Sequence, residues 1–182
     1  MNNRFLPYDE IETDAVLSFD DDMRLTHDEI NLAFRIWRQE RQRLVGFAGR
    51  FHIWHPKLQQ WYYGMHYSCQ MSMTLTNAVF YHKYYMYAYS FWMPQAIRNR
   101  VDELMNCEDI AMNFLISHIA KEPPIKVGLR HGIPCYDCPA TLSNQPQHYE
   151  ERTECLNYFS QVFGYNPLLY SFLTRTQQRK GY

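Results

Sequence analysis

Three adjacent carboxylates, Asp20, Asp21 and Asp22, follow an apolar run at residues 15–19. Like charges at neighbouring positions repel, so either solvent or a bound cation must offset the repulsion. Magnesium and manganese take oxygen ligands and usually leave coordination positions open for substrate phosphates. Ligands of open α/β sheets lie outside the carboxyl ends of the strands, so the triplet indicates a metal–nucleotide site. A solvated turn after a strand is the alternative that the spacing leaves open.

The cysteines are the second set of residues that could carry chemistry. Cys135 and Cys138 form a C-x-x-C, which fits half a zinc site, a redox pair or a strained disulfide. No second ligand pair has a convincing spacing, so we do not expect zinc. Cys107 and Cys155 lie far apart in the sequence, and Cys69 is left over. Two disulfides and one free thiol would suit an oxidising compartment.

Length and composition limit the class of protein. The 182 residues suit one domain, and 46% of them are apolar, as in globular proteins. The formal net charge of −1 gives no reason to expect nucleic acid as a partner. No apolar run is long enough to span a membrane, and residues 1–14 contain no apolar core of a secretion signal.

The acidic triplet needs a strand to position it, and residues 13–19 have the pattern of a short buried strand. Residues 43–54 predict a strand interrupted by glycines, and residues 55–63 contain a turn before another strand. The alternation of Met71, Met73 and Leu75 is strand-like, and the tyrosine-rich stretch that follows, ending at residue 90, could be helical. Because residues 15–19 are apolar at successive positions, we expect this strand to be covered on both faces and paired at both edges by parallel neighbours.

Three stretches predict helices. In residues 26–42, Thr26 and Glu29 form a capping box. One face of this helix gathers its apolar side chains, Ile30, Ala33, Phe34 and Trp37. Residues 106–124 predict a helix that acidic residues open and two prolines end, and residues 150–164 predict an amphipathic helix that Gly164 ends.

Strands that alternate with helices predict a single α/β layered domain over residues 1–182. We expect residues 128–149 to form a loop and the polar tail, residues 172–182, to be frayed.

Six stretches of this sequence resemble the C-terminal domain of the exostosin family, which is glycosyltransferase family 64. They occur in the family's order and cover nearly the whole chain: NRFLPYDEIETDAVLSFDDD, VGFAGRFHIW, FYHKYY, MNCEDIAMNFL, PPIKV and ERTECLNYFSQVFG. The resemblance implies a type A glycosyltransferase fold, which is Rossmann-like.

The same resemblance implies an activity. It is the retaining, manganese-dependent transfer of N-acetylglucosamine from UDP-N-acetylglucosamine to a glycosaminoglycan chain that ends in glucuronic acid, as in heparan sulfate biosynthesis. It also implies the lumen of the endoplasmic reticulum or Golgi, reached through a membrane anchor that this sequence lacks, and a homo- or hetero-oligomer with another exostosin.

In the family, the last aspartate of the acidic triplet binds manganese, which assigns the metal to Asp22. Asp20 and Asp21 would contact the donor's ribose and sugar. A divalent ion beside the departing diphosphate would stabilise its charge as a Lewis acid. By the same resemblance, Arg4 would contact the donor and Arg50 would approach the acceptor.

Asp109 matches a family aspartate near the reacting sugar carbon, where a fixed carboxylate favours an oxocarbenium-like transition state. The alternative for Asp109 and for Glu108, a predicted substrate contact, is stabilisation by the helix dipole, of up to about 1 kcal/mol. Arg152 matches an arginine beside the donor diphosphate, although a surface arginine with a packed stem is the simpler reading. The resemblance also implies a disulfide between Cys107 and Cys155.

Two rival functions remain open at this point. One is a non-catalytic partner subunit of a heteromeric exostosin polymerase, or an inactive fragment, and the other is a carbohydrate-binding module with an aromatic surface. Because the match starts partway into the family domain, we also expect upstream nucleotide-binding βα units to be missing from this sequence. The chain departs from the family at Asn77, where relatives usually carry glycine.

Overall fold

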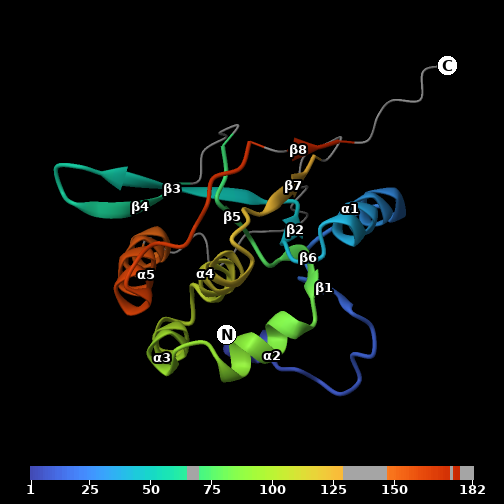
Figure 1. Cartoon of the computed structure of the whole chain (residues 1–182), viewed down its shortest axis with the longest axis horizontal. Helices are drawn as coiled ribbons and strands as arrows, with labels where there is room; N and C mark the ends of the chain where they lie inside the picture. Colours follow the sequence, from blue (N-terminus) through green and yellow to red (C-terminus); the bar gives the residue numbers. More distant parts are fainter. Residues whose placement is uncertain (65–69, 129–146, 173, 177–182) are drawn as a thin grey trace.

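A computed structural model of the chain describes residues 1–64, 70–128, 147–172 and 174–176. They form a five-stranded sheet and a three-stranded sheet, with helices packed against both (Figure 1). The five-stranded sheet has the order β1 (Ala15–Phe19), β6 (Ala78–His82), β2 (Val45–Gly46), β7 (Ile125–Val127) and β8 (Thr174–Arg175). The three-stranded sheet has the order β4 (Gln60–Gly64), β3 (Gly49–His55) and β5 (Met73–Thr74).

Both kinds of strand pairing occur in the five-stranded sheet. β6 pairs antiparallel with β1 and with β2, whereas β2 with β7 and β7 with β8 are parallel. This mixed sheet, covered by helices, confirms the predicted α/β class. The helical elements are η1 (Asn2–Phe5), α1 (His27–Gln39), α2 (Tyr84–Phe91), α3 (Gln95–Leu104), α4 (Glu108–Ala120) and α5 (His148–Phe163).

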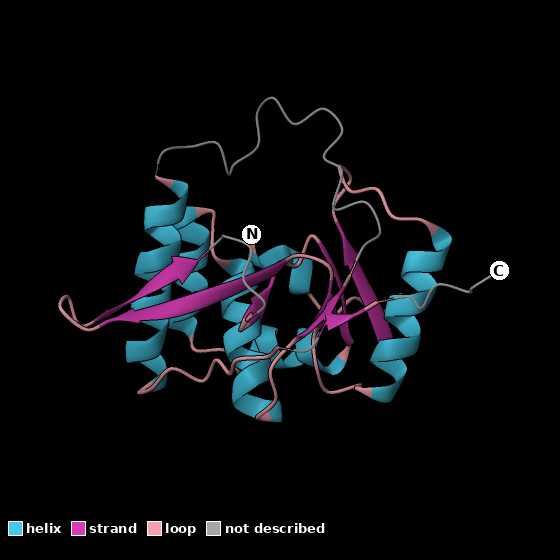
Figure 2. Ribbon diagram, turned by 90° about the horizontal axis from the view of Figure 1, so that it is seen from above, coloured by secondary structure: helices cyan, strands magenta, loops and turns pink. Residues whose placement is uncertain are grey.

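Strand β6 divides the core between the two faces of its sheet. Successive side chains of a strand point to opposite faces, so Val79 and Tyr81 pack with α2 and α4 in one buried cluster. Ala78 and Phe80 pack on the other face, in a second cluster with Trp37 of α1. Figure 2 shows α1 at one end of the molecule and the long β3–β4 hairpin extending toward the other.

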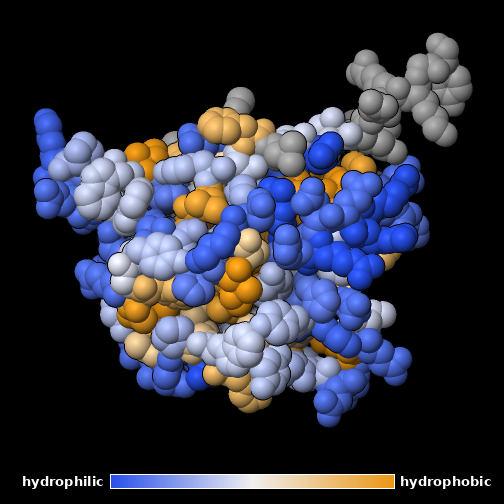
Figure 3. All heavy atoms as spheres, in the orientation of Figure 1, coloured by the Kyte–Doolittle hydropathy of each residue, from blue (hydrophilic) through white to orange (hydrophobic). Residues whose placement is uncertain are grey.

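The helix predictions from local signals are confirmed. Thr26 caps α1, with the reciprocal bond to Glu29 in place. Phe34, however, stays 36% exposed, because the buried side of α1 is formed mainly by Ala33, Ile36 and Trp37. The end of the molecule that carries α1 is mostly hydrophilic on the face in Figure 3. Gly164 ends α5 with a φ of 78°, as predicted.

The prediction for residues 15–19 is wrong in two respects. Among the described residues β1 pairs with β6 alone, so it lies at the sheet edge, and this pairing is antiparallel. None of its side chains is fully buried, and Phe19 is 42% exposed. An apolar run therefore indicated a strand here but not its place in the sheet.

Two further expectations need correction or completion. Residues 95–104 form α3, which the sequence did not predict. Thr174 and Arg175 form β8 beside β7, so these two residues of the tail are not frayed. Cys69, Cys135 and Cys138 lie outside the described residues. No helix in the described part of the chain is both long and apolar enough to cross a membrane.

Candidate active site

Arg4 joins the two acidic motifs that the sequence singled out. Asp20 follows the last residue of β1, and its backbone nitrogen donates to the Asn77 carbonyl at 2.8 Å, which prolongs the pairing with β6. The Arg4 guanidinium, carried by η1, forms an ion pair with Asp20 through Nη2. Its Nη1 lies 3.4 Å from a carboxylate oxygen of Glu108 and donates to Thr76 Oγ1 at 2.8 Å. The end of β1 and the start of α4 therefore meet at one arginine.

The remaining aspartates of the triplet, Asp21 and Asp22, are exposed in the turn after β1. Within the described ranges, no three His, Cys, Asp or Glu side chains gather closely enough to hold a metal ion by themselves. Manganese and magnesium sites that include substrate phosphates need only one or two carboxylates from the protein. The residues present therefore fit a metal shared with a bound diphosphate and do not fit a metal site built by protein alone.

A buried ion pair forms the second half of the site. Arg152 of α5 places Nη2 2.5 Å from Asp109 Oδ2, and both residues are 5% exposed. The other oxygen, Asp109 Oδ1, accepts the backbone N–H of Ile110 at 2.8 Å. The simpler reading of Arg152 as a surface residue is therefore wrong, because its charge is used inside the protein.

Two more side chains surround the Arg152 guanidinium. The hydroxyl of Tyr63, on β4, accepts from Nη2 at 3.0 Å, and the guanidinium carbon lies 4.4 Å from the Tyr63 ring centroid. Asn106 Oδ1 accepts from Nη1 at 3.2 Å. Nε is buried and has no hydrogen-bond partner among the described residues. Both terminal nitrogens thus bind protein oxygens. The family resemblance predicted that the Arg152 guanidinium contacts the donor diphosphate instead.

These contacts change the pKa values of the site residues. Burial acts to lower the pKa of Arg152, but the charge of Asp109, its hydrogen bond and the nearby Tyr63 and Glu108 together hold this pKa above its ordinary value. Burial raises the pKa of Tyr63, although Arg152 and Arg50 oppose the rise, so Tyr63 is a neutral hydroxyl at pH 7. Burial and, next, the charge of Asp109 raise the pKa of Glu108, while Arg4 acts against them.

The turn between α3 and α4 is held in an unusual backbone conformation. Met105 and Cys107 have φ angles of 50° and 73°, in the left-handed region that residues other than glycine rarely adopt. The structure contains the disulfide between Cys107 and Cys155, which ties this turn to α5. Asn106 Nδ2 adds bonds to Glu151 Oε2 at 2.9 Å and to a backbone carbonyl of α5. These ties hold the start of α4, and with it Asp109, beside Arg152 of α5.

Sequence reasoning missed three residues of this site: Tyr63, Thr76 and Asn106. Asn106 stands directly before Cys107 and the acidic pair, which is the one local signal that could have revealed it. The predicted Arg50 is half-buried on β3 and donates to the Gly49 carbonyl at 2.9 Å. Its charge acts to lower the pKa of Tyr63, and it lies two residues before His52, which pairs with Tyr63 across β3 and β4.

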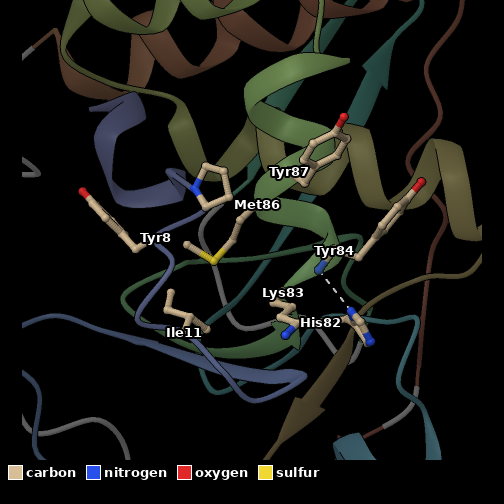
Figure 4. Close-up of a pocket in the computed structure, with 8 residues that line it drawn as sticks. Tyr8, Ile11, His82, Lys83, Tyr84, Met86 and Tyr87 are labelled. Atoms are coloured by element: carbon tan, nitrogen blue, oxygen red, sulfur yellow. Dashed lines mark hydrogen bonds between the residues drawn. The ribbon is translucent and has the colours of Figure 1, made fainter.

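A separate hollow of about 300 Å³ lies between the N-terminal segment and α2 (Figure 4). Tyr8, Met86 and Tyr87 line it. Lys83 also lines it, and the Lys83 Nζ donates to the Glu12 carbonyl at 3.0 Å. It adjoins His82, which pairs with Ala15 at the end of β1 that is opposite to Asp20. None of the predicted site residues lines this hollow.

Comparison with known proteins identifies relatives over nearly the whole sequence. The family model described as the glycosyl transferase family 64 domain matches residues 1–179. An exostosin-like-3 homolog of Caenorhabditis elegans is 48% identical over 171 residues, which are 94% of this chain and 21% of that protein.

Two exostosins show comparable similarity. Human exostosin-2 is 48% identical over 92% of the chain, and exostosin-1 of Drosophila melanogaster is 44% identical over 95% of it. The matched regions are 24% and 23% of these two proteins, so the chain spans less than a quarter of each relative's length.

Proposed function

The chain belongs to glycosyltransferase family 64, and from this premise we propose that it transfers N-acetylglucosamine from UDP-N-acetylglucosamine. The proposed acceptor is a glycosaminoglycan chain that ends in glucuronic acid, and the proposed process is heparan sulfate biosynthesis with retention of configuration. The proposed compartment is the lumen of the endoplasmic reticulum or Golgi, for which the Cys107–Cys155 disulfide is the structural support.

One observation carries the proposal. Arg4 contacts both Asp20, in the predicted metal and donor motif, and Glu108, which directly precedes the predicted catalytic Asp109. A donor diphosphate and a reacting sugar carbon are adjacent in the same molecule, so the groups that serve them must be adjacent too. Arg4 of η1, Asp20 directly after β1 and Glu108 of α4 are neighbouring groups of this kind, which supports the proposal.

Asp22 is the residue that would hold manganese together with the donor diphosphate, and Asp21 would contact the donor. When bound, the ion would supply Lewis-acid stabilisation of the negative charge that develops on the leaving group. Asp20 is the donor-side carboxylate whose orientation Arg4 fixes. The exposure of Asp21 and Asp22 leaves their oxygens accessible to a bound ligand.

Asp109 supplies the fixed negative charge of the reaction. Its carboxylate is held by Arg152 and by the Ile110 N–H, so it does not need to reorganise as positive charge develops at the sugar carbon. In the same position it can accept a hydrogen bond from the acceptor hydroxyl. Retention by double displacement would need a nucleophile on the far face of the sugar, whereas same-face return of the acceptor would not.

For Arg152 the proposal has two parts. Its first role is to hold Asp109, because both terminal nitrogens bind protein oxygens. Its predicted contact with the departing diphosphate would use Nε, or an exchange of partners when the donor binds.

The direct test is transfer of labelled N-acetylglucosamine from its UDP donor to a glucuronic-acid-ended oligosaccharide, with and without manganese, by the chain joined to the upstream nucleotide-binding units of a relative. We expect transfer that requires manganese and is lost in Asp109→Asn and Asp22→Asn but not in the exposed control Asp9→Asn. Manganese-dependent UDP binding without any transfer would instead support a non-catalytic partner subunit. Transfer that is unaffected by Asp109→Asn would overturn the catalytic assignment.

A further inference from the structure

The outer edge of β4 is closed by side chains of a helix. The Trp61 N–H donates to Asn157 Oδ1 at 2.8 Å, and Asn157 Nδ2 donates back to the Trp61 carbonyl at 2.8 Å. Two residues further along, the Tyr63 N–H donates to Thr153 Oγ1 at 3.2 Å. Thr153 and Asn157 are four residues apart on α5 and therefore lie on one face of this helix.

The opposite edge of the same sheet is closed in the same way. On β5, the Thr74 N–H donates to Asn113 Oδ1 at 3.0 Å, and Asn113 Nδ2 donates to the Thr74 carbonyl at 2.8 Å. Asn113 Nδ2 also contacts the Asp109 carbonyl at 2.8 Å, one turn earlier in α4. A side-chain carboxamide presents an N–H donor beside a C=O acceptor, as a peptide group does, so each asparagine replaces a missing strand partner, and its second N–H is free to bond elsewhere.

We call each of these sets of side-chain bonds at a sheet edge a seam. Each seam uses a helix that carries one member of the buried ion pair. Asn113 shares α4 with Asp109, and Asn157 and Thr153 share α5 with Arg152. The sheet β4-β3-β5 is therefore fastened at one edge to the helix of the carboxylate and at the other to the helix of the guanidinium. Figure 1 shows this sheet lying across the two helices.

Tyr63 is the residue through which the sheet touches the pair itself. Its backbone is fixed by Thr153, its hydroxyl accepts from Arg152 Nη2, and its ring lies against the guanidinium at 4.4 Å. The same Nη2 donates to Asp109. A guanidinium held from one side by an aromatic face and a hydroxyl has fewer orientations left in which to meet the carboxylate.

We propose that Tyr63 is a positioning residue for the Asp109–Arg152 pair, and that the Thr153 and Asn157 seam sets the position of Tyr63. The effect of Tyr63 on catalysis rests on the function proposed above, whereas the effect of Tyr63 on the ion pair does not. Tyr63 acts through Arg152, because its hydroxyl accepts from Arg152 Nη2 and its ring lies against the guanidinium.

The kinetic test compares two neighbouring tyrosines of β4. Tyr63→Phe removes the hydroxyl but keeps the ring, and we expect kcat to fall about tenfold with KM within about twofold. Tyr62→Phe is the matched control, because the Tyr62 hydroxyl contacts Gln60 instead, and it should leave both constants unchanged. An unchanged kcat in Tyr63→Phe, or a rise in KM alone, would overturn the proposal.

The seam is tested by removal and rescue at Thr153. Thr153→Val keeps the shape of the side chain and removes the acceptor of the Tyr63 N–H, so kcat should fall several-fold, by about three- to tenfold. Thr153→Ser restores a hydroxyl and should return kcat to within about twofold of the original protein. Equal kcat values in the two variants would show that the seam does not set the position of Tyr63.

A measurement without activity separates this proposal from the proposed function. A double-mutant cycle of Asp109→Asn and Arg152→Gln gives the coupling between the two residues as a factor in the unfolding equilibrium constant. We expect this factor to fall about tenfold when the cycle is repeated with Tyr63→Phe. If the protein transfers no sugar but the coupling falls, the proposed function fails and the positioning role stands. An unchanged coupling rejects the positioning role whether or not transfer is found.

Discussion

The two halves of the candidate site differ in how complete they are without a ligand. The acidic half, Asp20 to Asp22, follows an edge strand, and two of its three carboxylates are exposed. The ion-pair half, Asp109 and Arg152, is 5% exposed and bonded to protein groups on nearly every polar atom. The first half is open to solvent, and the second is assembled before any substrate arrives.

This difference follows from the charge that each half must handle. In the acidic half, Arg4 pairs with Asp20, and a bound cation and diphosphate would replace water beside the exposed Asp21 and Asp22. In the buried ion-pair half, fixed dipoles and charges act strongly and need no reorganisation, but an unpaired charge there is very costly. Substitutions should therefore affect stability in the ion-pair half and ligand binding in the acidic half.

The largest expected effect is on the ion pair. Arg152→Met removes the partner of Asp109 and leaves a buried carboxylate without its countercharge, so the free energy of unfolding should fall by about 3–5 kcal/mol. Urea denaturation measures this loss. The exposed Arg24→Met is the matched control and should change stability by less than about 0.5 kcal/mol. A loss below about 1 kcal/mol for Arg152→Met would remove the contrast between the halves.

The second prediction concerns the covalent tie of the ion-pair half. Cys107 and Cys155 are 48 residues apart, and in the chain-entropy model a loop of this size contributes about 4 kcal/mol. The double variant Cys107→Ser, Cys155→Ser should lose about this much, and a reducing agent should have little further effect on it. Peptide mapping without reduction should find the two cysteines linked in protein made in an oxidising compartment. Free thiols there would contradict the prediction.

Sequence reasoning succeeded where a signal is local. The capping box of Thr26 and Glu29, the prolines after α4 and the positive φ of Gly164 each depend on a few neighbouring residues. The prediction of the disulfide came instead from the family resemblance, because no spacing rule selects Cys107 with Cys155 from five cysteines.

The sequence could not reveal contacts that only the tertiary fold creates. An apolar run such as residues 15–19 fits a central or an edge strand, and pairing in the sheet decides between them. Tyr63 meets Arg152 across 89 residues, and Asn157 meets Trp61 across 96. Asparagine is usually read as a turn or capping residue, so its use as a strand partner leaves no periodic pattern. The helix α3, which follows the tyrosine-rich stretch, was also not predicted from the sequence.

The third prediction concerns how the stability of the protein depends on pH. His52 of β3 is 2% exposed, and burial lowers its pKa to about 4. The folded state thus disfavours the protonated ring, so its contribution to stability is complete above pH 6.5 and is lost as pH falls toward 4. The loss should reach about 3 kcal/mol, since each pKa unit corresponds to about 1.4 kcal/mol. His52→Asn should flatten this part of the stability profile, and a profile parallel to that of the original protein would contradict the assignment.

The smallest expected effect on stability is at Asp22, where the effect on binding should be the largest. Asp22→Asn removes one of three neighbouring negative charges from an exposed turn, so the free energy of unfolding should stay within about 0.5 kcal/mol. Calorimetry with UDP and manganese, on protein that also carries the upstream nucleotide-binding units of a relative, should show binding with the original sequence and with Asp9→Asn, and no manganese-dependent binding with Asp22→Asn. Because Asp22 is exposed and its proposed role is to bind the metal, stability and binding should separate at this residue, whereas at the buried Arg152 they should fall together. Unchanged manganese-dependent affinity in Asp22→Asn would remove the metal from the acidic half and leave the dry ion pair as the site's one defined component.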